Sequence, residues 1–295
     1  MSCSDMKSCT NNCAKSYAPK SMDELSVALG KMTPDSRIIS GGTDLIIALN
    51  QSYTEPDALL YLGGVDGISD IAETAEGIKI GAMATMADLA ECKILTGPYA
   101  ALRQAAADVG SVQIRAAATI GGNIANASPA GDIAPVLCLL DALAVVADGS
   151  AVRRIPVDCL LTGSGKTSLA YNEAITGFIL PAKWSGTAKS AFYKLGYRRA
   201  LTVSRISLAI LLDFDPNGYI SFADIVAGAI APVPVHAEKA GQLLIGKKPG
   251  SDVAKDVGKQ LSELVLEITP EEFDRDYKAR AAFGIANDIF ERLCI

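Results

Sequence analysis

Two glycine-rich segments, each with a Gly-Gly pair near a hydroxyl residue, constrain this chain more than any other feature. The first covers 38–44, Ile-Ile-Ser-Gly-Gly-Thr-Asp, and the second covers 119–132, Thr-Ile-Gly-Gly-Asn-Ile-Ala-Asn-Ala-Ser-Pro-Ala-Gly-Asp. Backbone without Cβ can approach a phosphate closely and direct successive N–H groups at it. One such segment suits one phosphate. Two of them, roughly 80 residues apart, indicate a diphosphate held from both sides, as in a dinucleotide.

The neighbouring sequence supports this interpretation and also leaves a simpler one open. We expect a short buried strand at 37–39 and a helix at 44–50, which is the strand, loop and helix order of phosphate-binding loops. A Gly-Gly pair also marks an ordinary turn. Asp132 precedes an apolar run, so it could be the N-cap of a helix starting at 133. The two roles, cap and neighbour of a phosphate, are compatible.

Periodicity and turn residues predict an α+β fold with two domains after a tail. We expect a flexible tail at 1–16, a first domain at 17–182 and a smaller C-terminal domain at 189–295. The first domain is expected to divide into subdomains at 17–56 and 57–182.

Local patterns predict individual elements within these domains. Ser21 followed by Glu24 predicts a capped helix. Another helix is expected to start at Thr85, with Asp88 as its fourth residue. Residues 68–81 are expected to form a hairpin. In the C-terminal domain we expect alternating strands at 191–194, 206–214 and 219–227, and helices at 236–245, 252–266 and 271–293.

Three further stretches, taken with the glycine segments, resemble the FAD-binding subunit of molybdenum hydroxylases, the xanthine dehydrogenase and carbon monoxide dehydrogenase group. They are 111–115 (Ser-Val-Gln-Ile-Arg), 192–200 (Phe-Tyr-Lys-Leu-Gly-Tyr-Arg-Arg-Ala, with Ser204 after it) and 228–235 (Gly-Ala-Ile-Ala-Pro-Val-Pro-Val). The resemblance extends over roughly residues 17–290. It implies a two-subdomain FAD-binding domain of the vanillyl-alcohol-oxidase (PCMH) type, followed by a smaller α+β domain with an antiparallel sheet and helices.

The resemblance also implies which residues contact the FAD, with no catalytic residue and no metal ligand among them. The matching positions are Ile38, Ile39, Ser40, Gly41, Gly42, Thr43, Asp44, Val109, Thr119, Gly121, Gly122, Asn123, Asp132, Ile175 and Lys194. The glycine segments would hold the diphosphate, and the Asp132 carboxylate would accept hydrogen bonds from a ribityl or ribose hydroxyl. Ile175 and Lys194 would lie near the ends of the cofactor, although a strand core residue and a strand-edge cation are the simpler interpretations. Val109 stands where some relatives carry an aromatic ring, so it would pack without stacking.

The implied reaction is electron transfer, in which the flavin carries the chemistry and the protein binds and tunes it. The chain lacks the plant-type C-x₄-C-x₂-C pattern of iron–sulfur proteins. Hydroxylation would therefore occur on partner chains, a [2Fe–2S] subunit and a molybdenum-cofactor subunit, with NAD⁺ as the electron acceptor. Two alternatives remain open: a free-standing FAD-dependent oxidase or reductase of the same fold, and a non-catalytic nucleotide-binding scaffold.

Charge and hydropathy narrow the class of partner and the location. Lys and Arg total 27 against 33 Asp and Glu, and the net charge of −6 disfavours nucleic acid. A helix needs about 20 apolar residues to span a bilayer, and the longest apolar runs of this chain are shorter. The N-terminal residues show no signal-peptide pattern, so a cytoplasmic location is the default expectation.

Cysteine, histidine and a Gly-Lys-Thr segment are the other potentially reactive features of the sequence. Seven cysteines, an odd number in a chain that is neither small nor secreted, argue against disulfides. Cys3, Cys9 and Cys13 fall in the polar tail, either as free thiols or as part of a metal or iron–sulfur site. His236, the single histidine, is expected to be structural or on the surface. The segment 163–168, Gly-Ser-Gly-Lys-Thr-Ser, has Leu160 where a Walker A motif requires glycine, so it is expected to be a loop.

Overall fold

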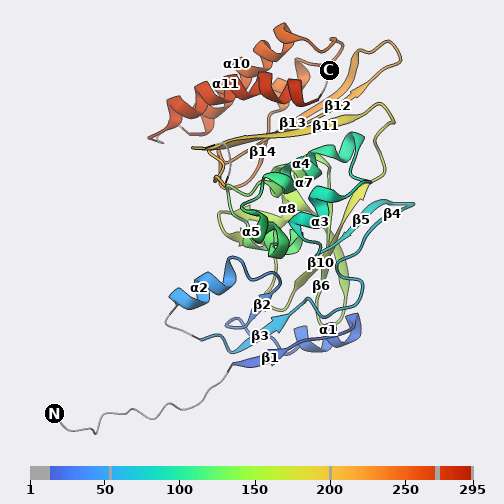
Figure 1. Cartoon of the computed structure of the whole chain (residues 1–295), viewed down its shortest axis with the longest axis vertical. Coiled ribbons are helices and arrows are strands. Elements are labelled where there is room, and N and C mark those ends of the chain that lie inside the picture. The colour runs from blue at the N-terminus through green and yellow to red at the C-terminus, as the bar shows by residue number, and fades with distance from the viewer. Residues whose placement is uncertain (1–13, 53–54, 199–200, 270–272, 294–295) are drawn as a thin grey trace, which may run out of the picture.

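The computed structural model describes residues 14–52, 55–198, 201–269 and 273–293, whose three larger sheets are stacked along the long axis (Figure 1). The first sheet is parallel, in the order β1-β3-β2. Its strands and helices are β1 (Lys15–Tyr17), α1 (Met22–Leu29), β2 (Arg37–Ile39), α2 (Leu45–Gln51) and β3 (Ala58–Tyr61). Helix α1 is capped as expected, since the Ser21 side chain accepts a hydrogen bond from the Glu24 backbone N–H.

Two expected boundaries are wrong at this end of the chain. Strand β3 pairs with both β1 and β2, so the first subdomain extends beyond residue 56 to at least Tyr61. Lys15 and Ser16 belong to β1 rather than to a tail, and residues 1–13, including Cys3, Cys9 and Cys13, lie outside the described residues.

A five-stranded antiparallel sheet, in the order β4-β5-β10-β6-β7, forms the middle of the molecule. Its strands are β4 (Ile71–Thr74), β5 (Gly77–Gly81), β6 (Leu143–Ala147), β7 (Val152–Pro156) and β10 (Ala174–Pro181). The hairpin expected at 68–81 is β4-β5. A smaller hairpin, β8 (Leu161–Gly163) and β9 (Lys166–Thr167), contains the Gly-Lys-Thr segment, which therefore lies in no strand, loop and helix unit.

Helices connect β5 to β6 and fill the centre of the molecule. They are α3 (Met86–Glu91), the 3₁₀ turn Gly97–Tyr99, α4 (Ala100–Asp108), α5 (Val112–Ala117), α6 (Ile120–Asn126) and α7 (Ile133–Leu139), with α8 (Val157–Leu160) after β7. Helix α3 begins at the expected position, where Thr85 and Asp88 form a capping box. Every residue of α7 is buried. In contrast, none of the residues of α2 and α5 is buried.

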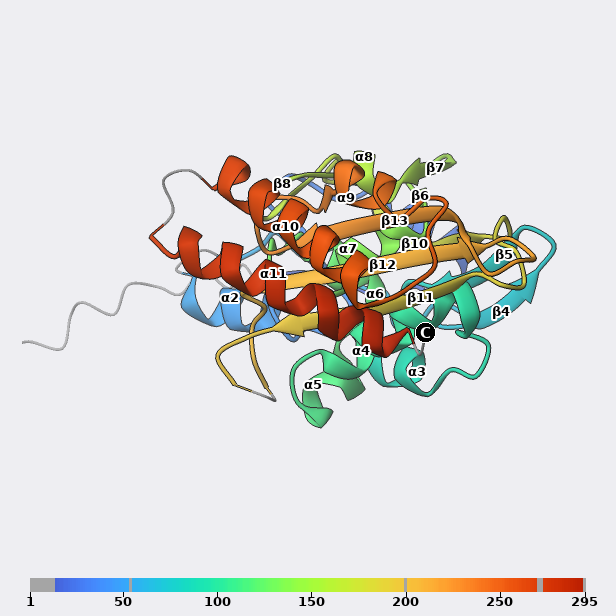
Figure 2. The same cartoon turned by 90° about the horizontal axis from the view of Figure 1, so that it is seen from above.

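The C-terminal domain is an antiparallel sheet, β11-β12-β13-β14, covered by helices on one face (Figure 2). Its elements are β11 (Lys189–Leu195), β12 (Ile206–Phe214), β13 (Ile220–Gly228), β14 (Val235–His236), α9 (Glu238–Gln242), α10 (Ser251–Ile268) and α11 (Arg275–Arg292). The helix expected at 236–245 is shorter because His236 pairs with Val226 as part of β14. None of the described helices is long and apolar enough to cross a membrane.

Strand β12 explains why the two domains form one packed unit. Ala209 and Leu211 join the hydrophobic core of the first domain, whereas Leu208, Ile210 and Leu212 join the core beneath α10 and α11. Successive strand residues point to opposite faces, so an uninterrupted apolar run suits a strand that is buried on both. The C-terminal domain is therefore held to the first domain by apolar packing, chiefly against α4 and α7.

His236 adds a polar link between the same two domains. Its Nδ1 lies 3.0 Å from an Asp224 carboxylate oxygen on β13, and its Nε2 lies 3.4 Å from Asp158 on α8. Hydrogen bonds to Asp158 and Asp224 raise the pKa of His236 to about 10. The imidazolium in turn lowers the pKa of Asp158. The histidine is thus structural, which is one of the two roles expected from the sequence.

We expect His236→Ala to lower the free energy of unfolding by about 1.5–3 kcal/mol in mildly acidic buffer, the usual range for a hydrogen bond to a charged group. The pKa of the imidazole is raised on folding from 6.5 to about 10. The stabilisation is therefore complete below pH 6.5 and lost as the pH rises through about 10. Urea unfolding of both proteins across this range should show a difference that shrinks as the pH increases. A difference that stays constant would show that the charge on His236 contributes nothing.

Candidate functional site

Both glycine segments line one cavity of about 620 Å³, a volume in the usual range for small-molecule sites. Residues of helix α2 and residues 169–171 also line this cavity. The expected cofactor residues that line this cavity are Ile38, Ser40, Gly41, Gly42, Thr43, Asp44, Thr119, Gly121, Gly122, Asn123 and Ile175. The fold therefore brings together most of the residues that the sequence singled out, from three separate parts of the chain.

The first glycine segment forms a tight turn after β2, and its amide groups have no partner in the described part of the chain. A Cβ on Gly41 would overlap the Ala117 carbonyl oxygen, so glycine is required for the two backbones to come this close. Gly42 adopts a φ of 70°, in the left-handed region that favours glycine. None of the backbone N–H groups from Gly41 to Asp44 donates a hydrogen bond to another described residue. Successive unpaired amides in a turn are suited to binding an anion.

The second glycine pair lies in the first turn of α6 and not in an open loop, which corrects the expectation from sequence. Thr119 is the N-cap, and its side chain accepts a hydrogen bond of 3.1 Å from the Gly122 N–H. The Gly121 N–H donates to the Ala82 carbonyl at 2.9 Å, and a Cβ on Gly121 would lie 2.7 Å from the Ala82 Cβ. Gly121 is therefore needed for packing of α6 against the chain that leaves β5.

A short polar contact joins the two glycine segments. The Thr119 hydroxyl donates a hydrogen bond of 3.1 Å to the Ser40 hydroxyl. A Cβ on Gly122 would lie 2.7 Å from the same Ser40 oxygen. The Asn123 Oδ1 is buried and has no hydrogen-bond partner among the described residues. An unpaired buried acceptor costs stability unless something donates to it, so this atom indicates a ligand or water in the cavity.

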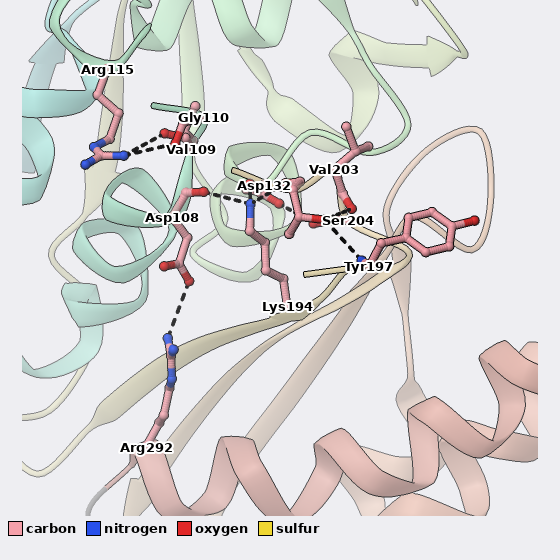
Figure 3. A network of polar contacts seen from close by, with 11 residues as sticks. Asp108, Val109, Gly110, Arg115, Asp132, Lys194, Tyr197, Val203, Ser204 and Arg292 are labelled. Atoms are coloured by element: carbon pink, nitrogen blue, oxygen red, sulfur yellow. Dashed lines mark hydrogen bonds and ion pairs between the residues drawn. The ribbon is translucent and has the colours of Figure 1, made fainter. Parts of the chain in front are cut away.

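Four of the expected residues lie outside this cavity. Ile39 is in β2, close to Gly42, and Val109 follows α4. Asp132 and Lys194 form a nearly buried ion pair of 2.6 Å (Figure 3). Asp132 is the N-cap residue of α7, as expected, although its side chain makes no capping hydrogen bond. Lys194 lies on the edge strand β11, as expected, but its side chain is only 9% exposed.

The Asp132 carboxylate is fully engaged within the protein. One oxygen faces Lys194 and the other accepts a hydrogen bond of 2.6 Å from the Ser204 hydroxyl. Lys194 also donates to the carbonyl oxygens of Asp108, at 2.7 Å, and Thr202, at 3.3 Å. Burial raises the pKa of Asp132, while Lys194 and Ser204 act in the opposite direction. This network ties the start of α7 to β11 and to the chain between β11 and β12.

A second cavity, of about 790 Å³, lies beside this network. Two of the positive side chains at this cavity are neutralised by a nearby carboxylate. Lys194 pairs with Asp132, and Arg292 pairs with Asp108 at 3.6 Å. The guanidinium groups of Arg115 and Arg198 donate to backbone carbonyl oxygens and so keep a net positive charge at this cavity. Its electrostatic character therefore favours an electron-rich or anionic group.

Three contributors to this region were not identified as site residues from the sequence. They are Asp108, Ser204 and Arg115. Ser204 and Arg115 belong to stretches that the sequence singled out, so their positions were noticed but their contacts were not. Asp108 participates through its backbone carbonyl as well as its side chain, and no sequence pattern marks a carbonyl. No group of three or more His, Cys, Asp or Glu side chains within the described ranges is placed to hold a metal ion.

Comparison with protein families agrees with this geometry. Residues 11–183 match the FAD binding domain in molybdopterin dehydrogenase, and residues 191–293 match the CO dehydrogenase flavoprotein C-terminal domain. The chain belongs to this family of FAD-binding oxidoreductase subunits, and its cofactor is FAD. The resemblance inferred from the glycine segments is confirmed.

Individual relatives align along most of their length. The nicotinate dehydrogenase FAD-subunit of Eubacterium barkeri is 29% identical over 279 residues, covering 93% of this chain and 94% of that protein. The xanthine dehydrogenase FAD-binding subunit of Escherichia coli O157:H7 is 33% identical over 215 residues, covering 71% and 73%. A solved structure of carbon monoxide dehydrogenase from Hydrogenophaga pseudoflava superposes with a TM-score of 0.84 at 24% identity, covering 95% of this chain and 97% of that one, and it shows the shared fold.

The residues present fit an FAD molecule at the first cavity. The glycine segments leave room where side chains would otherwise project, and four successive amides and the Asn123 oxygen lack protein partners among the described residues. These groups supply both donors and an acceptor, as the diphosphate and hydroxyl groups of FAD require.

Proposed function

We propose that FAD spans both cavities, with its diphosphate between the two glycine segments and its flavin ring at the second, positively charged cavity. The observation that carries this proposal is the row of amides from Gly41 to Asp44, which have no partner among the described residues and lie next to the N-terminal turn of α6. Helix α5 connects the two cavities, since Arg115 lines the second and Ala118 lines the first. Val112, at the start of this helix, also lines the second cavity, and at about 1.5 Å per residue the six-residue step from Val112 to Ala118 rises about 9 Å. A ribityl chain and its phosphate can bridge such a distance.

Under this proposal each expected contact has a defined task. Ser40, Gly41, Gly42, Thr43, Thr119, Gly121, Gly122 and Asn123 hold the diphosphate region, with Ile38, Ile39 and Asp44 flanking it. Ile175 also lines the first cavity and would contact the adenosine end. Val109, Asp132 and Lys194 lie at the ring end, where the ion pair fixes the surrounding backbone. The ribityl or ribose contact proposed for Asp132 would require its carboxylate to share an oxygen with Lys194 or Ser204.

We further propose that the chain is one component of a multi-subunit molybdenum hydroxylase. The names of the relatives describe FAD subunits or a medium chain of nicotinate, xanthine and carbon monoxide dehydrogenases, which supports this assignment. FAD supplies the capacity to accept electrons one at a time and to release them as a pair. A partner [2Fe–2S] subunit would deliver those electrons from a molybdenum-cofactor subunit, and NAD⁺ would receive them.

Reconstitution tests this proposal directly. We expect the purified chain to bind FAD without a covalent link, so that acid denaturation releases the flavin. The chain alone should fail to hydroxylate nicotinate or a purine, and it should do so only after the iron–sulfur and molybdenum subunits are added. Unaided oxidation of a small alcohol or amine would instead support the free-standing oxidase. A chain that stays colourless with excess FAD would contradict the whole proposal.

A further inference from the structure

We propose that Arg115 is a positioning residue, which shapes the ring end of the FAD site by fixing the turn at residues 109–111. The inference rests on the proposed location of FAD and extends it to a residue with no assigned role. One guanidinium nitrogen, Nη1, donates to two successive carbonyl oxygens, those of Val109 at 3.0 Å and Gly110 at 3.1 Å (Figure 3). Both Gly110 and Arg115 line the second cavity.

The turn held by Arg115 requires glycine at position 110, and it depends on nearby residues of α5. Gly110 has a φ of 45°, and a Cβ at this position would lie 2.9 Å from the Ile114 Cγ2. Ser111 caps α5 by accepting a hydrogen bond from the Ile114 N–H. Both ends of the stretch 111–115 therefore support the preceding turn. Ser111 caps α5 directly after the turn, and the Arg115 guanidinium reaches back to bind it.

Hydrogen bonds, rather than packing, keep α5 in place. A helix of six residues is not stable alone, and no residue of α5 is buried. The contact of Arg115 with the turn holds its N-terminal end. At its C-terminal end, the Ala118 carbonyl accepts a hydrogen bond of 2.9 Å from the Met86 N–H, and the Ala117 carbonyl touches Gly41. A substitution at Arg115 should therefore alter the ring end of the FAD site most, and the glycine segments less.

The charge of Arg115 provides a second, separable effect. Reduction adds negative charge to a flavin, and a nearby guanidinium stabilises that form relative to the oxidised one. Lysine would retain the charge, but it lacks the planar fork of donors that arginine presents to neighbouring acceptors. Comparing lysine with an uncharged side chain of similar length therefore separates positioning from charge.

The test compares Arg115→Met, Arg115→Lys and Arg103→Met in the full-length chain. Arg103 is an exposed arginine on α4, outside the second cavity, so it controls for loss of an arginine. The readouts are FAD affinity by fluorescence titration, visible circular dichroism of the bound flavin, and its midpoint potential. We expect Arg115→Met to weaken FAD binding about tenfold, to change the visible dichroism and to lower the potential. Arg115→Lys should restore the potential but not the dichroism, and Arg103→Met should match wild type.

Wild-type affinity, dichroism and potential in Arg115→Met would overturn the inference. If that variant does not fold, Gly110→Ala disturbs the same turn without removing the charge, and it should change the visible dichroism. Unchanged dichroism in Gly110→Ala would also count against the role of the turn. Failure of the wild-type chain to bind FAD would refute the proposed function, a result distinguishable from a failure at Arg115 alone.

Discussion

Gly122→Ala should lower the affinity of the protein for FAD about 100-fold, which corresponds to about 2.7 kcal/mol. The added methyl group would lie 2.7 Å from the Ser40 hydroxyl oxygen and 3.0 Å from that of Thr119. It would therefore push apart the two segments that we propose hold the diphosphate. The fold should survive, because both contacts are with side chains and alanine favours a helix over glycine by about 1 kcal/mol. Titration of the apoprotein with FAD measures the affinity, and thermal unfolding measures the stability.

Two other glycines make this experiment specific. Gly284 lies in α11 with no atom near the position of a Cβ, so Gly284→Ala should leave FAD affinity unchanged and stability slightly higher. At Gly41 the methyl group would overlap a backbone carbonyl, so Gly41→Ala should lower both affinity and stability. Wild-type affinity in Gly122→Ala would mean that the space between the segments is not where FAD binds.

Asp132→Ala should lower the free energy of unfolding by about 3–5 kcal/mol, the usual effect of leaving one member of a buried ion pair without its partner. The Lys194 ammonium is only 9% exposed, and without Asp132 it would retain only carbonyl oxygens as partners. Lys194→Met should be similarly destabilising. The double variant should lose less than the sum of the two, because it leaves no uncompensated charge.

An exposed ion pair provides the control for this cycle. Glu76 pairs with Arg154 at 3.2 Å, with both side chains about half exposed, so Glu76→Ala should change the free energy of unfolding little. Urea unfolding of the four variants and the wild type gives the comparison. If Asp132→Ala is as stable as Glu76→Ala while its FAD affinity falls sharply, the carboxylate serves the cofactor and not the fold.

Local sequence was sufficient to predict the elements whose determinants are close together in the chain. The capping residues Ser21 and Thr85 mark the starts of α1 and α3, and the glycine segments mark the cavity. Contacts between distant residues could not be predicted in this way. Strand β3 joins the first sheet through parallel pairing with two strands, and periodicity carries no information about which strands pair.

In the candidate site, too, local sequence indicated the residues, but it did not indicate their contacts with distant parts of the chain. The role of Gly121 depends on Ala82, and that of Gly41 depends on Ala117, so the sequence indicated glycine without indicating what requires it. Asp132 was expected near the cofactor because of a resemblance, whereas its partner Lys194 lies 62 residues away along the chain. Burial of the pair, and the hydrogen bond from Ser204, arise only when β11 packs against α4 and β12 packs against α7.

Hydrogen exchange at the first glycine segment tests the central claim most directly. The backbone N–H groups from Gly41 to Asp44 have no acceptor among the described residues, so they should exchange rapidly in the apoprotein. Binding of FAD should slow exchange in a peptide covering residues 38–45, because the diphosphate would accept hydrogen bonds from these amides. Residues 252–266 of α10, in the C-terminal domain, should show no change. Tight FAD binding with unaltered exchange at 38–45 would contradict the account.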